Sequence, residues 1–257
     1  MAKLDAFFLV FGAIVGCATT GNSALGDAGA DATSAGASQS QDGGAEETGS
    51  SEAVDGGALD GAGPTKPLAC PPGSVANFSP TWKPPKALHA AACSVPQSQL
   101  AVDCAFDPST KPAACDEFFG DAGNSACMLC VLSDDFDTTY GPVVMNGVYA
   151  VLNLGGCIAA LSGNTAASSC GAKVQAITEC QQHACKGCPD PAAGGKALSD
   201  YLECQKAASS TVCSSYVSAA SCADPLIQPG GVAAACAEGN NAFLDRAHAL
   251  ARLFCTP

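Results

Sequence analysis

The chain has 257 residues, 17 of them cysteines and 28 glycines, and its 24 acidic residues against 11 basic ones give a formal net charge of -13. Proteins that bind nucleic acids cluster Lys and Arg to neutralise phosphates, so this composition argues against a nucleic-acid partner. The acid excess also argues against electrostatic attraction to an anionic membrane, and no apolar run reaches the roughly 18 residues that a membrane-spanning helix needs.

Residues 1–17 have the pattern of an export signal. Lys3 supplies a short positive region, and residues 6–15 form an apolar run that only Gly12 interrupts. The run is too short to span a bilayer but has the length of a signal-peptide core. It ends in the sequence IVGC at residues 14–17, which resembles the lipobox of bacterial lipoproteins.

This resemblance implies that Cys17 is the lipid attachment site. In lipoproteins the cysteine thiol receives diacylglycerol and the signal is cut just before it; several acyl chains, palmitate among them, then hold the protein durably at a membrane. Ala18 stands where Asp often marks retention in the inner membrane, so the outer membrane is favoured. The alternatives are ordinary secretion after cleavage beside Cys17, and a chain without export whose Cys17 is a free cysteine.

Residues 18–66 predict a disordered tether. Gly, Ala and Ser fill 28 of these 49 positions, and eight acids face a single base, Lys66. Such a segment buries too little apolar surface to offset the entropy of ordering. Its glycines make it flexible and its like charges extend it. We expect it to hold the following domain away from a lipid surface.

Residues 67–257 predict a disulfide-stapled domain. They contain 16 cysteines, and an even, dense set of cysteines in an exported chain is typical of a disulfide framework. Few large apolar residues are available for a core, so cross-links are expected to supply much of its stability. The pairing is left open. The predicted disulfide-forming residues are Cys70, Cys93, Cys104, Cys115, Cys127, Cys130, Cys157, Cys170, Cys180, Cys185, Cys188, Cys204, Cys213, Cys222, Cys236 and Cys255.

The secondary structure of this domain is expected to be mainly α, in disulfide-rich helical hairpins. Apolar residues recur at helical spacing, and neighbouring cysteines often lie nine to twelve residues apart, which suits hairpins pinned across facing helices. In two stretches β-branched residues are compatible with either a helix or a strand. Prolines predict that the first part of the domain has no regular secondary structure. The predicted helices are 170–185, 196–208 and 242–254, the open stretches are 143–154 and 211–220, and the irregular segment is 68–96.

Some cysteine motifs also suit other chemistry. Cys180-x4-Cys185-x2-Cys188 matches three ligands of a plant-type iron–sulfur site, with Cys213 or Cys222 as the fourth. Redox and zinc motifs often have two cysteines separated by two residues, and this spacing occurs in Cys127-x2-Cys130 and Cys185-x2-Cys188. An oxidising compartment favours structural disulfides over each of these alternatives, so no cofactor and no metal is expected.

Three further features are candidate sites. The acidic turn at residues 134–141 offers oxygen ligands for Ca²⁺, but it lacks the glycine and glutamate of an EF-hand loop. Trp82 is either an exposed anchor for a ligand or a cap on the core. His89, His183 and His248 lie in no recognisable catalytic motif, so no catalytic residue is assigned, although a Ser-His-Asp site could assemble in space.

The sequence therefore predicts a lipid-anchored, non-enzymatic protein of the bacterial cell envelope, facing the periplasm or the exterior. Its partners would be the membrane, through the lipid, and an extracytoplasmic protein or glycan. Two alternatives stay open. One is a secreted or anchored hydrolase with a spatially assembled site, and the other is a disulfide-rich inhibitor or protective protein.

Overall fold

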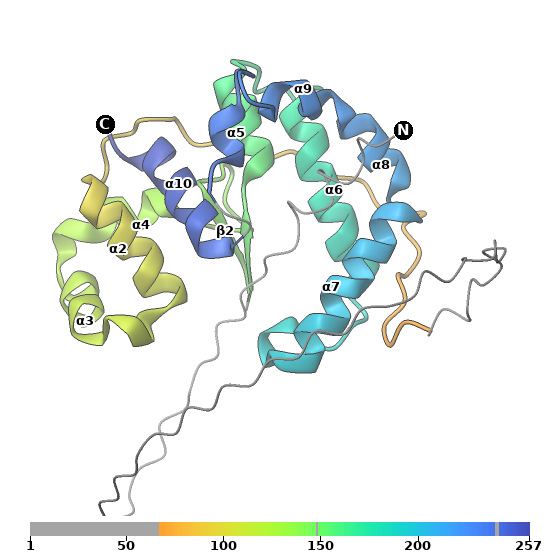
Figure 1. The fold of residues 1–257 in the computed structure, drawn as a ribbon, viewed down its shortest axis with the longest axis horizontal. Helices are drawn as coiled ribbons and strands as arrows, with labels where there is room; N and C mark the ends of the chain where they lie inside the picture. Colours follow the sequence, from red (N-terminus) through yellow and green to blue (C-terminus); the bar gives the residue numbers. More distant parts are fainter. Residues whose placement is uncertain (1–66, 148, 240–241) are drawn as a thin grey trace, which may run out of the picture. The chain divides into compact units, whose positions relative to one another are not determined.

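The computed structural model describes residues 67–147, 149–239 and 242–257. Helices dominate this part of the chain, as expected, and a small three-stranded sheet accompanies them (Figure 1). The signal peptide, Cys17 and the tether lie outside the described residues. The α-helices are α2 (Val95–Phe106), α3 (Pro112–Gly120), α4 (Ser125–Val131), α5 (Leu154–Leu161), α6 (Cys170–Cys185), α7 (Gly195–Ser210), α8 (Ser214–Ala219), α9 (Asp224–Ile227) and α10 (Phe243–Cys255).

The shorter elements connect these helices. The strands are β1 (Leu132–Asp134), β2 (Val143–Asn146) and β3 (Tyr149–Leu152). Short 3-10 helices occupy Pro108–Thr110, Ala122–Asn124, Pro191–Ala193, Ala220–Ala223 and Ala234–Ala237. In Figure 1, α2, α3, α4 and α10 gather on one side of α5 and the sheet, and α6 to α9 gather on the other.

Helix α2 begins where the sequence supplies a capping box. The Ser94 hydroxyl accepts a hydrogen bond from the Gln97 backbone N–H at 3.4 Å, and Gln97 Oε1 accepts one from the Ser94 N–H at 2.8 Å. The two bonds satisfy donors that a helix start otherwise leaves without partners. The chain from residue 67 to this cap contains no helix, which confirms the predicted irregular beginning.

The sheet comes from one of the two stretches that the sequence left open. Strand β2 pairs parallel with β1 and antiparallel with β3, and Asn153 then caps α5 by accepting from the Gly156 N–H at 2.9 Å. Residues 143–154 therefore contain two strands and the start of a helix. Residues 211–220 contain α8 instead.

Helices α6 and α7 form the expected hairpin. The predicted helix 170–185 coincides with α6, and 196–208 lies within α7. Ser169 caps α6 by accepting from the Ala172 N–H at 3.1 Å. The disulfide Cys185–Cys204 cross-links α6 and α7, and Cys180–Cys213 joins α6 to the residue that precedes α8.

The last helix, α10, packs against α2 and α4. Phe254 is fully buried and Leu250 is 1% exposed, while the Phe243 ring meets the edge of Phe106 with centroids 5.1 Å apart. The predicted helix 242–254 is thus confirmed within one residue at each end. Its apolar stripe faces the core, as such a stripe predicts.

Eight disulfides join the sixteen cysteines from Cys70 onward, so the expected framework is present. They connect segments that lie from 11 to 125 residues apart, which the sequence alone could not pair. The bridges are Cys70–Cys188, Cys93–Cys127, Cys104–Cys115, Cys130–Cys255, Cys157–Cys236, Cys170–Cys222, Cys180–Cys213 and Cys185–Cys204.

Candidate functional site

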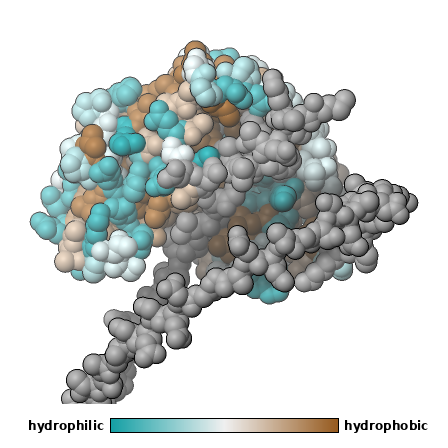
Figure 2. Space-filling view, viewed as in Figure 1, coloured by the Kyte–Doolittle hydropathy of each residue, from teal (hydrophilic) through white to brown (hydrophobic). Residues whose placement is uncertain are grey.

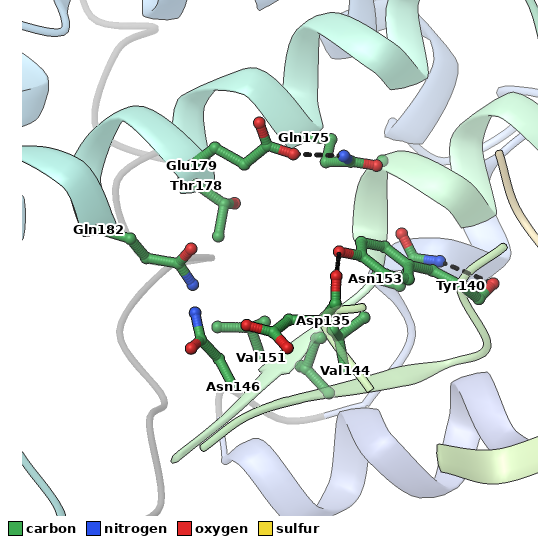
Figure 3. A pocket seen from close by; sticks show the side chains of 12 residues that line it. Asp135, Tyr140, Val144, Asn146, Val151, Asn153, Gln175, Thr178, Glu179 and Gln182 are labelled. Carbon is green, nitrogen blue, oxygen red and sulfur yellow. Dashed lines mark hydrogen bonds between the residues drawn. The ribbon is translucent and has the colours of Figure 1, made fainter. Parts of the chain in front are cut away.

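A pocket lies between α6 and the sheet (Figure 3). Its empty volume is about 450 Å³, which includes space open to solvent. In the close view, Thr178, Glu179 and Gln182 project from α6, and Asn146, Val151 and Asp135 lie opposite them on the sheet side. The lining residues are Asp135, Tyr140, Val144, Asn146, Val151, Leu152, Asn153, Gly155, Gln175, Thr178, Glu179 and Gln182.

The sheet supplies an apolar floor to this pocket. Val144 and Val151 lie directly opposite each other in the antiparallel pair, so both side chains point to the same face. The neighbouring Val143 and Ala150 are completely buried on the core side. The alternation of side chains along a strand thus divides these valines between the core and the pocket.

Glu179 anchors the helical wall of the pocket. One of its carboxylate oxygens accepts a hydrogen bond from the Thr81 backbone N–H at 2.8 Å, and the other accepts one from Gln175 Nε2. Gln175 Nε2 also donates to the Thr81 carbonyl at 3.0 Å. Burial raises the pKa of Glu179, although these hydrogen bonds and Lys83 act in the opposite direction.

Asp135 lies in the turn that follows β1. Its backbone N–H donates to the Met145 carbonyl at 3.0 Å, and its own carbonyl accepts from the Tyr140 hydroxyl at 3.0 Å. These bonds fix the turn against β2. Burial raises the pKa of the Asp135 carboxyl, and the neighbouring Asp134 raises it further.

Two buried acceptor atoms of the pocket lining have no hydrogen-bond partner among the described residues. They are Oδ1 of Asp135 and Oε1 of Gln175. Gln175 is only 8% exposed. A buried acceptor without a partner costs free energy. An occupant that donates hydrogen bonds would recover that cost.

The electrostatic character of the pocket is negative. Burial, and then the charges of Glu179 and Asp135, raise the pKa of Tyr140 to about 12, so its hydroxyl stays neutral. The described lining residues include two acids and no Lys, Arg or His. Lys83 is close enough to lower the pKa of both acids, but its Nζ donates to the Asp137 carbonyl at 2.9 Å.

The acidic turn that the sequence offered for Ca²⁺ contributes one wall of the pocket through Asp135 and Tyr140. A metal site needs several ligand atoms close together. Within the described chain, one group of three or more His, Cys, Asp or Glu ligand atoms lies within 4.8 Å of one another, and it consists of three cysteine sulfurs. Asp134, Asp135 and Asp137 do not form such a group. The turn therefore lacks the preassembled carboxylate set that Ca²⁺ binding uses.

The cysteine motifs form disulfides with distant partners rather than within themselves. Cys180, Cys185 and Cys188 pair with Cys213, Cys204 and Cys70, so no thiolate of the iron–sulfur pattern is free. Cys127 and Cys130 likewise pair with Cys93 and Cys255. The redox and zinc alternatives for both C-x-x-C motifs require thiols that the oxidised protein does not have.

The other sequence candidates lie outside the pocket lining. Trp82 is half-buried and its Nε1 donates to the Thr165 carbonyl at 2.9 Å, which favours a structural role. His248 Nε2 lies within hydrogen-bond distance of Asp103 Oδ1, at 2.8 Å, and this contact joins α10 to α2. His183 packs against the Phe78 ring at 5.2 Å.

Exposed hydrophobic side chains are dispersed over several elements. Figure 2 shows hydrophobic and hydrophilic residues interspersed on the face that it presents. The most exposed of the large hydrophobic residues is Phe136, at 86%, next to Asp135 in the turn. The others are Leu68, Val95, Phe119, Leu129 and Val232.

The sequence indicated only part of this pocket. Asp135 stood out in the acidic turn, but Glu179 and Gln175 read as ordinary polar positions on a helix. The one available signal was that both lie one turn apart on α6, a spacing that places their side chains together. Their contact with Thr81, which is 98 residues from Glu179, carries no local signal.

No family model matches this chain, and no curated protein or solved structure matches it. Within the described part of the chain, none of the helices combines the length and the apolar character required to cross a membrane.

Proposed function

We propose that this protein is a non-enzymatic, lipid-anchored component of a bacterial cell envelope, anchored in the outer membrane. Its disulfide-stapled domain binds a small polar ligand. The lipobox-like residues 14–17 support the anchor. The eight disulfides support an oxidising, extracytoplasmic location, since such cross-links persist outside the reducing cytosol. The acidic tether would give the domain reach beyond the lipid surface.

The observation that carries the binding function is the pair of buried acceptors that lack partners in one pocket, Asp135 Oδ1 and Gln175 Oε1. Buried polar groups in folded proteins are nearly always hydrogen-bonded. Aliphatic side chains below and polar groups around them are the usual composition of a small-molecule site. Cross-links on α6, the helix that carries Gln175, hold the site in place.

Lipid anchoring is tested by intact mass. The protein purified from bacterial membranes is expected to begin at Cys17 with a diacyl or triacyl mass and to contain no alkylatable thiol before reduction. The Cys17→Ser variant should lose the lipid mass and leave the membrane fraction. A native protein that retains its first sixteen residues would contradict the anchor.

Binding is tested by native mass spectrometry of the full-length mature protein after incubation with small molecules extracted from bacterial envelopes. A ligand of constant mass should remain on the wild-type protein. The variant Thr178→Trp, whose indole would fill the pocket from an incompletely buried position on α6, should not retain it. Retention of the same mass by both proteins, or of none by the wild type, would refute the pocket as the binding site.

Hydrolysis is a second candidate because one pocket holds two carboxyl groups with raised pKa, Asp135 and Glu179. An acid with a raised pKa can donate a proton to a leaving group while a second carboxylate assists. The test is release of reducing sugar from envelope glycans. Activity that disappears in both Asp135→Asn and Glu179→Gln would favour this candidate over simple binding.

A further inference from the structure

We propose that the pocket binds a small organic amine, with its ammonium group between Asp135 and Glu179 and its hydrocarbon part on the valine floor. This inference rests on the proposed binding function and specifies the chemical class of the ligand. It is carried by the charge, the polarity and the shape of the lining.

The first step is the balance of donors and acceptors. Glu179 already accepts two hydrogen bonds from the protein, whereas Asp135 Oδ1 and Gln175 Oε1 are buried acceptors without a partner in the described chain. An ammonium group has three N–H donors and no acceptor. It therefore supplies what this lining lacks.

The second step is charge. Two acids and no basic residue belong to the described lining. Lys83 lowers the pKa of both acids, but its Nζ is hydrogen-bonded to the Asp137 carbonyl. A neutral alcohol could satisfy the acceptors but would form no charge-assisted hydrogen bond with either carboxylate. An ammonium group forms charge-assisted hydrogen bonds, which are stronger than neutral ones.

The third step is the apolar floor. Val144 and Val151 face the pocket as a directly opposed pair. A metal ion or ammonia would make no use of it. The hydrocarbon part of a small amine would cover it.

The experiment compares two probes of equal length, 1,5-diaminopentane and pentane-1,5-diol, by isothermal titration calorimetry on the full-length mature protein at pH 7.5. The diamine should bind at least about tenfold more tightly than the diol, because only the diamine forms charge-assisted bonds. Equal affinity for the two probes, or no binding of the diamine, would overturn the inference.

Matched variants assign the affinity to the pocket. Asp135→Asn and Glu179→Gln should each weaken diamine binding about tenfold or more, whereas Asp116→Asn and Glu117→Gln remove the same charges from exposed positions on α3 and should not. Circular dichroism of each variant verifies folding. Equal weakening by the α3 variants would show non-specific attraction to net negative charge and would also overturn the inference.

The outcomes separate this inference from the broader function. If the envelope ligand retained by the wild type and lost in Thr178→Trp proves to be a neutral or anionic molecule, the binding function stands and the amine assignment fails. If Thr178→Trp binds the diamine as the wild type does, the amine binds elsewhere and the assignment of the pocket fails.

Discussion

Glu179 is one of the residues at which the irregular N-terminal segment and helix α6 meet. Its carboxylate receives the Thr81 N–H and the Gln175 amide together, so one side chain fixes both a loop and a helix face. These hydrogen bonds favour the charged form, but burial disfavours it more, and the pKa is raised from 4.5 as a result. Folding therefore favours the protonated form of Glu179 over the charged form, relative to the unfolded chain.

This raised pKa predicts how Glu179 affects stability. The folded protein binds the Glu179 proton more tightly than the unfolded chain does, so the contribution is complete below about pH 4.5 and is lost as pH rises through the raised folded pKa. The free energy of unfolding of the wild type minus that of Glu179→Gln should fall over this window. Guanidinium denaturation from pH 4 to pH 8 measures it.

The control for this prediction is Glu117→Gln, an exposed position on α3. Its difference from the wild type should be nearly flat over the same window. A difference for Glu179→Gln that rises with pH would mean that the hydrogen bonds to the carboxylate outweigh its burial, and the sign of the assigned shift would then be wrong.

At the scale of elements, helices α5 and α6 cross with almost no side chain between them. A Cβ on Gly155 would lie 2.5 Å from the Gly171 carbonyl oxygen and 2.8 Å from the Gln175 backbone nitrogen. Real side-chain atoms do not approach backbone so closely, so glycine is required for this contact. The crossing also positions Gln175 at the edge of the pocket.

We expect Gly155→Ala to destabilise the protein by about 1–3 kcal/mol, because the added methyl forces two helix backbones apart. Helix propensity alone predicts the opposite sign, since alanine is favoured over glycine by about 1 kcal/mol within a helix. Gly120→Ala is the matched control, because a Cβ there meets nothing within 4 Å. Equal stability changes in the two variants, measured by chemical denaturation, would contradict the close crossing.

The elements that the sequence predicted well are those whose own apolar pattern is complete. Helix α10 buries its apolar residues at the 3.6-residue spacing, and helix α6 has the bounds that the sequence predicted. Residues 143–154 could not be assigned, because strands of four residues are too short for periodicity to separate them from a helix. The sheet depends on pairing between β1 and β2, which are separated by the acidic turn. The pocket in turn depends on α6 lying opposite that sheet.

Across the whole molecule, disulfides join segments that lie far apart in the sequence. Two of them span more than 100 residues each, Cys70–Cys188 and Cys130–Cys255, and they tie the irregular beginning and the last helix into the domain. The even number of cysteines predicted a framework, but it could not select a pairing. Pairing follows from which helices pack together, and that is decided by tertiary contacts rather than by cysteine spacing.

The span of each bridge predicts its contribution to stability. Cys104–Cys115 closes 11 residues, whereas Cys130–Cys255 closes 125 along the chain. With Cys157–Cys236 intact, the shortest path through the unfolded chain is about 46 residues, so loop entropy makes the longer bridge worth about 1 kcal/mol more. Replacing both cysteines of a pair with alanine should show this difference in guanidinium denaturation.

All four of these cysteines are buried, so the cavities left by the two double variants are similar and their difference reports mainly on the unfolded chain. The larger loss is expected for Cys130→Ala/Cys255→Ala in the otherwise oxidised protein. An equal or larger loss for Cys104→Ala/Cys115→Ala would mean that native packing at the α2–α3 hairpin, rather than loop entropy, determines what each bridge contributes.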